Sequence, residues 1–282
     1  MAERSENVRL ALFGESNVGK SHYGGQLLSR IATDSCELKL RGAPSDLSAF
    51  DEVRRRLNQG KSAGHTPSGV YRESTWPVKY GAGTELELVW PDYAGEQVRN
   101  LIDTRRMGRE WLERTQAAAG WLLIVRPKLS GLDHDIFSRP LGDLRKPSKD
   151  DPAMAHRSNQ ARLVELLQML LYARGLHGER SIPPLAVLLS CWDELGLQGG
   201  AKPAAVFEKW LPLLASFIRS HWRTRAIVFG LSALGTELRE DVANEEFVDK
   251  GPEHFGFVVL PDGTTDSDLT NPIVNLAKMA KA

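Results

Sequence analysis

Short apolar runs alternate along the chain with longer segments in which apolar residues recur at helical spacing. The apolar runs predict strands over residues 8–13, 121–125, 185–189 and 226–231. The periodic segments predict helices over 20–32, 97–118, 161–173, 204–219 and 269–279. Strands that alternate with helices in this order are typical of an α/β fold with a largely parallel sheet.

A β-hairpin interrupts this alternation. Residues 75–80 and 84–90 flank a glycine-containing turn at 81–83. A short strand is predicted over 36–40, and a last strand or hairpin over 255–260. The pattern therefore predicts a three-layer, doubly wound, mostly parallel sheet of about six strands with one antiparallel edge hairpin.

Two segments depart from the pattern. Residues 43–60 are predicted to contain an additional helix, with Ser45 as its N-cap, because a serine hydroxyl can accept a hydrogen bond from a first-turn N–H. Residues 128–157 are charged, contain glycine and proline, and lack periodicity, which predicts a mobile loop. We therefore expect a single domain over 1–282 with a helical insert and a charged loop.

Charge and composition argue against several kinds of partner. Lys plus Arg and Asp plus Glu each number 36, so the net charge does not indicate nucleic acid or an anionic membrane. No apolar run approaches the roughly 20 residues that span a bilayer, and the N-terminal segment is charged where a signal peptide needs an apolar core. Cys36 and Cys191 form no metal-binding pair. We expect a soluble, cytoplasmic protein.

Residues 14–21 carry the strongest chemical signal. They read GESNVGKS and match the phosphate-binding pattern GxxxxGK followed by serine or threonine. The glycines let the backbone wrap around a phosphate, and the following helix points the positive end of its dipole at the same anion. Lys20 would reach the β- and γ-phosphates, and the Ser21 hydroxyl would coordinate Mg²⁺. The alternative is an ordinary glycine turn, but the preceding strand and the following helix favour a nucleoside triphosphate site.

A second motif follows the hairpin, where residues 92–95 read Asp-Tyr-Ala-Gly. An aspartate at this strand end can hold Mg²⁺, usually through a water, while the N–H of Gly95 can meet the γ-phosphate. Loss of the γ-phosphate would then release the segment, which converts nucleotide state into shape. The alternative is a surface turn in which Asp92 caps the next helix.

With the hairpin, these motifs resemble the translation-factor and Ras-like class of P-loop GTPases. The resemblance implies a base-reading aspartate after the fifth strand and a Ser-Ala pair after the sixth. Asp193 and the pair Ser232-Ala233 stand in those places. Asp193 would accept hydrogen bonds from guanine N1 and N2, and the Ala233 N–H would donate to O6. The implied ligands are GTP and GDP with Mg²⁺.

The base motif departs from the family pattern Asn-Lys-x-Asp, because residues 190–193 read Ser-Cys-Trp-Asp. The lysine that packs along the base and tethers the P-loop is absent, and Ser190 offers a hydroxyl in place of an amide. Strict selectivity for guanine therefore stays open. Trp192 is either a packing residue or a neighbour of the base.

The resemblance also implies a first-switch threonine and a residue that orients the attacking water. Thr66 is our prediction for the threonine, with Ser68 and Thr75 as competitors. Where the Ras-like class has glutamine directly after the glycine, this chain has Glu96, followed by Gln97. Glu96 could orient or deprotonate water, but its charge repels the γ-phosphate, and capping of the following helix is an equal alternative.

The predicted site combines these residues. The predicted catalytic residues are Lys20, Thr66, Glu96 and Gln97, and the predicted Mg²⁺ ligands are Ser21, Thr66 and Asp92. The predicted nucleotide contacts are Gly14, Asn17, Val18, Gly19, Lys20, Ser21, His22, Gly95, Asp193, Ser232, Ala233 and Leu234. Arg126, after the strand at 121–125, is a candidate for stabilising transition-state charge, although arginines at strand ends are common.

Most of the chain further resembles the bacterial double-GTPase family of predicted conflict or defence systems. The resemblance rests on the P-loop strand, the helical insert before residues 65–67, and the segments 93–96, 190–193 and 257–263. It implies a switch that works with a second GTPase or a protein effector. Two other functions stay open: a P-loop small-molecule kinase with residues 139–157 as a lid, and a nucleotide-binding scaffold with little turnover.

Overall fold

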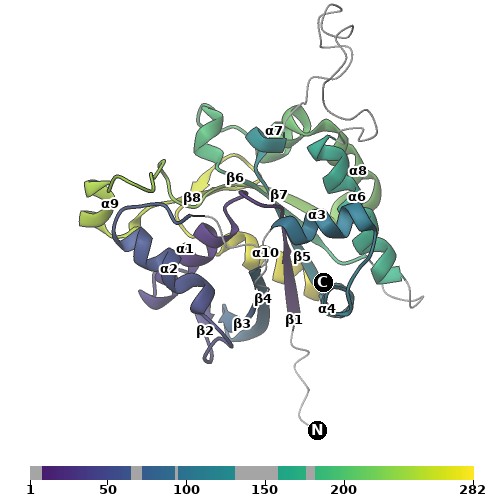
Figure 1. Cartoon of the computed structure of the whole chain (residues 1–282), viewed down its shortest axis with the longest axis horizontal. Helices are drawn as coiled ribbons and strands as arrows, with labels where there is room; N and C mark the ends of the chain where they lie inside the picture. Colours follow the sequence, from purple (N-terminus) through teal and green to yellow (C-terminus); the bar gives the residue numbers. More distant parts are fainter. Residues whose placement is uncertain (1–7, 65–71, 93–94, 131–157, 176–181) are drawn as a thin grey trace, which may run out of the picture.

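The computed structural model describes residues 8–64, 72–92, 95–130, 158–175 and 182–282. Its strands are β1 (Val8–Phe13), β2 (Lys39–Leu40), β3 (Arg72–Tyr80), β4 (Thr84–Asp92), β5 (Gly120–Val125), β6 (Leu185–Ser190), β7 (Ala226–Ser232), β8 (Phe257–Val259) and β9 (Thr265–Asp266). They form a nine-stranded sheet in the order β2-β3-β4-β1-β5-β6-β7-β8-β9 (Figure 1).

The middle of the sheet is parallel, and both margins are antiparallel. β1 pairs in parallel with β4 and β5, and β6 pairs in parallel with β5 and β7. β3 and β2 add antiparallel strands at one margin, and β8 and β9 add them at the other. The predicted α/β fold with a hairpin is confirmed. The sheet has more strands than the expected number of about six: the short segments predicted over 36–40 and 255–260 join it as β2 and β8, and β9, which has 2 residues, leaves no periodic pattern in the sequence.

Helices cover both faces of the sheet. They are α1 (Lys20–Ala32), α2 (Ser48–Asn58), α3 (Gly95–Thr104), α4 (Arg109–Ala117), α5 (Pro127–Ser130), α6 (Asn159–Gly175), α7 (Pro203–Trp210), α8 (Pro212–Trp222), α9 (Glu245–Lys250) and α10 (Asn271–Lys281), with the 3₁₀ segments η1 (Trp192–Leu195), η2 (Arg223–Arg225) and η3 (Pro252–His254). Along β1, Leu10 and Leu12 join the core beneath α1 and α10, whereas Ala11 and Phe13 join the core beneath α3, α6 and α8. A strand buried on both faces is expected in the middle of a three-layer fold.

Two predicted single helices are each divided in two. The segment 97–118 forms α3 and α4, which are separated at Arg105, where the backbone is left-handed (φ 52°). The segment 204–219 forms α7 and α8, because Pro212 has no backbone N–H and starts a new helix. The apolar periodicity continues through both breaks, so it did not reveal them. Of the loop predicted over 128–157, residues 128–130 belong to α5, and 131–157 lie outside the described residues.

The helix predicted in the insert is α2, which begins later than expected. Its N-cap is Leu47 rather than Ser45. The Ser45 hydroxyl instead accepts a hydrogen bond from the N–H of Thr75 in β3 (2.9 Å). α2 packs closely on α1 at Gly24, where a Cβ atom would lie 2.3 Å from the ring of Phe50. Glycine is therefore what permits this approach of the two helices.

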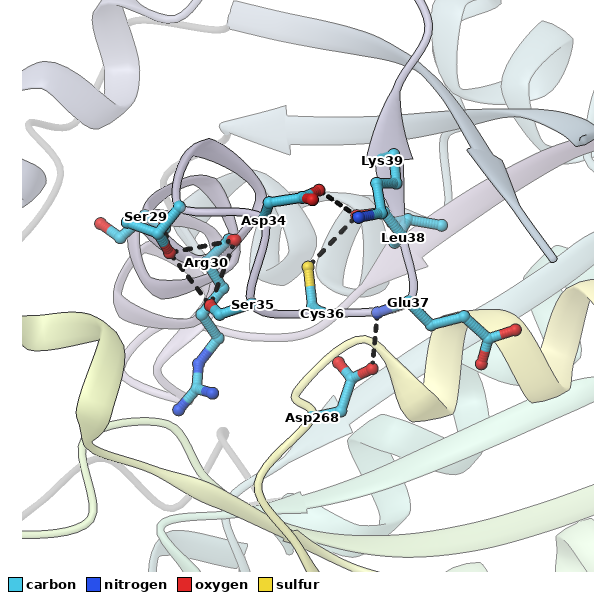
Figure 2. Close-up of polar contacts among 10 residues, drawn as sticks. Ser29, Arg30, Asp34, Ser35, Cys36, Glu37, Leu38, Lys39 and Asp268 are labelled. Atoms are coloured by element: carbon cyan, nitrogen blue, oxygen red, sulfur yellow. Dashed lines mark hydrogen bonds and ion pairs between the residues drawn. The ribbon is translucent and has the colours of Figure 1, made fainter.

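The end of α1 is fastened to the C-terminal part of the chain. Figure 2 shows Arg30 near this end and, separately, the carboxylate of Asp268 beside Glu37. The Arg30 guanidinium is buried and donates hydrogen bonds to the carbonyls of Ser267 (2.6 Å) and Phe255 (2.5 Å). The N–H of Glu37 donates to the Asp268 carboxylate (2.8 Å). These bonds hold the helix that follows the P-loop against the segment that precedes α10.

Candidate nucleotide-binding site

The predicted P-loop is a tight turn between β1 and α1. A Cβ atom on Gly14 would lie 2.9 Å from the carbonyl oxygen of Ile124 in β5, so only glycine fits where the loop leaves the strand. Gly19, immediately before α1, has a left-handed backbone (φ 81°), and Asn17 within the loop has one too (φ 62°). This curled backbone is the shape that lets successive N–H groups converge on an anion.

Lys20 is the first residue of α1 and folds back over the loop. Its side chain is 9% exposed, and Nζ donates hydrogen bonds to the carbonyl oxygens of Gly14 (2.9 Å) and Glu15 (2.5 Å). The ammonium therefore lies where the loop curls and brings a positive charge to it. A buried lysine is costly unless its donors are paired, and these carbonyls provide that pairing.

An ion pair to α6 neutralises the carboxylate within the P-loop. Glu15 pairs with Arg162, and the two side chains are 12% and 17% exposed. Because Arg162 follows Glu15 by 147 residues, periodicity and motif spacing gave no indication of this contact. The pair offsets a negative charge that would otherwise lie in a loop suited to anions.

His22 connects α1 to the segment that leads to the predicted first switch. Its Nε2 accepts a hydrogen bond from the N–H of Ala63 (3.1 Å). Burial lowers the pKa of His22, and the nearby charge of Glu240 partly opposes this effect. The imidazole is therefore neutral at pH 7, as its role as an acceptor requires.

The second motif lies at the same edge of the sheet as the P-loop. β1 and β4 are parallel, with Ala11 opposite Val89, so the residues that follow both strands are neighbours. Asp92 ends β4, and Gly95 begins α3, followed by Glu96 and Gln97 in its first turn. The intervening residues 93–94 lie outside the described residues.

The threonine predicted for the first switch lies outside the described residues. Thr66 and its competitor Ser68 both fall within residues 65–71. The other competitor, Thr75, lies inside β3 opposite Val89, where its N–H and carbonyl both bond to Ser45. Thr75 therefore belongs to the hairpin margin of the sheet rather than to a loop.

The two base motifs meet at the ends of β6 and β7. The hydroxyl of Ser232 donates a hydrogen bond to Oδ1 of Asp193 (2.5 Å), and the N–H of Gly235 donates to the same hydroxyl (3.0 Å). Ala233 and Leu234 form the turn that this pair of bonds closes, and both are half-buried. Residues 39 positions apart are thus brought together as the sequence predicts.

The altered positions of the base motif serve the packing of the sheet. Trp192 is 7% exposed, and it covers Gly230, where a Cβ atom would lie 2.5 Å from the indole. Ser190 donates its hydroxyl to the carbonyl of Val125 (3.2 Å), which links β6 to β5. Burial raises the pKa of the Cys191 thiol to about 12, so the position that usually holds a lysine carries no charge at pH 7.

Arg126 directly follows β5 and contacts both halves of the predicted site. Nη1 donates to the carbonyl of Asn17 in the P-loop (3.2 Å), and Nε donates to the carboxylate of Glu194 (3.1 Å), which Nη2 also contacts. Desolvation lowers the pKa of Arg126, but the hydrogen bond to Glu194 and the neighbouring negative charges raise it by more. The position of Arg126 after a predicted strand marked it as a candidate, whereas no motif or spacing pointed to Glu194.

The described segments contain neither a group of three or more acidic, histidine or cysteine side chains that could hold a metal ion nor a helix long and apolar enough to cross a membrane.

A strand, a curled glycine loop and a buried lysine at the start of a helix define a P-loop nucleotide-binding protein. The sequence model of the Double-GTPase 1 family matches residues 11–276. The chain belongs to this family, as its resemblance to double GTPases predicts, and the family supports GTP binding and GTP hydrolysis in general. Among curated proteins, no sequence matches the chain.

Several solved structures are similar at low identity. The Arl6 (BBS3) small GTPase from Trypanosoma brucei is 15% identical, with a TM-score of 0.41 and 98% of each chain covered. The signal recognition particle receptor SRβ–SRX complex from Chaetomium thermophilum is 12% identical, with a TM-score of 0.39 and 82% of this chain and 93% of that chain covered. The bacterial selenocysteine-specific elongation factor EF-Sec is 13% identical, with a TM-score of 0.38 and with 80% of this chain and 26% of that chain covered. Similarity this low assigns no residue or ligand.

Proposed function

We propose that this chain is a guanine-nucleotide switch that binds GTP with Mg²⁺ and hydrolyses it to GDP and phosphate. The observation that carries the proposal is the hydrogen bond between Ser232 and Asp193 (2.5 Å). It orients a carboxylate at the sheet edge that also bears the P-loop. A carboxylate accepts hydrogen bonds from guanine N1 and N2, whereas adenine presents the opposite pattern there, so this arrangement favours guanine.

At the phosphate end, the P-loop residues would bind through their backbone. The N–H groups from Asn17 to His22 would donate to phosphate oxygens. His22 would contribute only its backbone, because its imidazole already accepts a hydrogen bond from Ala63. Lys20 would exchange its two loop carbonyls for oxygens of the β- and γ-phosphates. The Gly95 N–H would add a contact to the γ-phosphate and thereby sense its loss.

The residues predicted to hold Mg²⁺ have suitable chemistry. Ser21 and Thr66 offer hydroxyl oxygens and Asp92 a carboxylate, and oxygen donors are what Mg²⁺ prefers. When bound, the ion would neutralise charge on the phosphates. Within the chain, Ser21 and Thr66 would bind the ion and Asp92 would orient a water on it.

Hydrolysis is expected to be slow without a partner. Glu96 occupies the position after Gly95, and its charge opposes approach to the γ-phosphate. Either Glu96 or Gln97 would orient the attacking water once a partner fixes the start of α3. The partner is a protein effector or a second GTPase, and the setting we infer is a bacterial conflict or defence system in the cytoplasm.

Single-turnover assays with GTP and with ATP test the proposal, with Lys20→Ala as the control that removes phosphate binding. Release of phosphate from GTP and not from ATP is the expected result. Preference for ATP would refute the guanine assignment, and a requirement for a third substrate would indicate a kinase. Tight GTP binding without phosphate release, even with candidate partners present, would indicate a scaffold.

A second assay addresses the base contact alone. Asp193→Asn replaces the acceptor that meets guanine N1 and N2 by an amide that can donate. We expect the variant to prefer xanthine nucleotides, because xanthine presents an acceptor in place of the N2 donor. A preference for guanine that does not change would remove Asp193 from the site.

A further inference from the structure

Arg126 lies where the phosphate half and the base half of the site adjoin. β5 is placed between β1, which leads into the P-loop, and β6, which leads into the base motif. All three strands are parallel, so the residue directly after β5 lies between the two loops. A long side chain at this position can reach both of them.

The contacts of Arg126 join these loops. Nη1 donates to the carbonyl of Asn17, at the left-handed residue that turns the P-loop, and Nε and Nη2 hold the carboxylate of Glu194. Glu194 follows Asp193 directly in η1. The side chains of Arg126 and Glu194 are 28% and 25% exposed, so solvent screens the pair only in part.

This geometry differs from that of an arginine poised for transition-state charge. The guanidinium already uses Nε and both terminal nitrogens on protein oxygens. Movement to the γ-phosphate would break a two-point pairing with a carboxylate, the geometry that arginine satisfies best. The same planar fork holds two chain segments at a fixed separation, which a positioning role requires.

We propose that Arg126, held by Glu194, is a positioning residue that fixes the P-loop at the distance from Asp193 that a guanine nucleotide needs to be held at both ends. The inference rests on the proposed function, because it concerns a ligand that engages Lys20 and Asp193 together. A site whose two halves are already spaced correctly loses less free energy when it orders around the ligand. Arg126 would therefore slow nucleotide release.

The test compares ligands that engage one half of the site or both. In Arg126→Met, we expect fluorescently labelled GDP to dissociate about 10- to 100-fold faster, which corresponds to the loss of one hydrogen bond to a charged group. Affinity for inorganic pyrophosphate, which meets the P-loop alone, should stay within about 3-fold of the wild-type value. Glu194→Gln should give a smaller increase, and the double variant should be no faster than Arg126→Met, because Glu194 acts through Arg126.

The control is Arg219→Met, which removes an exposed ion pair with Glu208 and should leave GDP release unchanged. GDP release from Arg126→Met at the wild-type rate would overturn the inference. So would an equal loss of GDP and pyrophosphate affinity, since Arg126 would then only shape the P-loop. If wild-type protein and Lys20→Ala bind GDP equally poorly, the proposed function itself fails.

Discussion

Replacing Arg30 tests how much its buried hydrogen bonds contribute to the free energy of unfolding. Arg30→Met keeps an unbranched chain in the same space and removes the guanidinium. In the native protein that group donates to the carbonyls of Ser267 (2.6 Å) and Phe255 (2.5 Å), with a longer bond to Gly256 (3.3 Å). The substitution therefore leaves buried carbonyls without this donor.

The magnitude follows from the two short bonds. Hydrogen bonds to charged groups contribute about 1.5–3 kcal/mol each, so their loss costs about 3–6 kcal/mol. Part is offset, because burial lowers the pKa of Arg30, which means that keeping the charge in the interior is itself unfavourable. We expect the free energy of unfolding to fall by about 3 kcal/mol, a large share of the 5–15 kcal/mol typical of a domain.

Urea unfolding followed by tryptophan fluorescence measures this change. Arg219→Met is the matched control, because its ion pair with Glu208 is exposed and should change the free energy of unfolding by less than about 0.5 kcal/mol. If Arg30→Met unfolds within that same margin of the wild-type protein, the bonds from Arg30 to the carbonyls of Ser267 and Phe255 do not stabilise the fold.

Three further predictions concern packing, pH and thiol reactivity. Gly24→Ala should destabilise the protein by about 1–3 kcal/mol in urea, because its Cβ would lie 2.3 Å from Phe50; Gly175→Ala, which meets nothing within 4 Å, should not, and equal effects would contradict the argument. Since burial lowers the pKa of His22 from 6.5, the unfolded chain binds more protons below pH 6.5, so stability should fall as the pH drops through 6.5. His22→Asn should weaken this dependence, and an identical pH profile would disprove the role of His22. Burial raises the pKa of Cys36 to about 11 and that of Cys191 to about 12, so iodoacetamide at pH 8 should alkylate both far faster in urea than in the native protein; equal rates would exclude burial as the cause.

Local signals in the sequence predicted the strand and the helix on either side of the phosphate loop. β1 and α1 span the residues expected, because a compact apolar run, a glycine loop and an amphipathic helix each leave a pattern within a few positions. Asp193 and Ser232 were placed by strand order, and the parallel pairing of β6 and β7 brings them into contact. A parallel α/β sheet collects such loops at one edge.

Contacts between distant segments could not be predicted. Arg162 pairs with Glu15 across 147 residues, and Arg30 meets Ser267 across 237. No periodicity records such partners, because any exposed or buried arginine looks the same in the sequence. The break between α3 and α4 was not predicted for another reason. It lies at Arg105, which has a left-handed backbone although arginine is common inside helices.

The segment that leads to the predicted first switch packs against a later part of the chain. The segment 59–64, which leads towards the predicted Thr66, bonds to 239–244 through the N–H of Ser62 to the carbonyl of Arg239 (3.0 Å) and the N–H of Asn244 to the carbonyl of Gly60 (2.9 Å). Leu234, in the predicted base-binding turn, packs on the small core that α2 and α9 share. The P-loop, by contrast, is held by contacts with β5 and α6. Because the N–H of Ala63 in the segment 59–64 also bonds to His22 at the start of α1 (3.1 Å), we expect a change at the predicted first switch to reach both the predicted base-binding turn and the end of the P-loop.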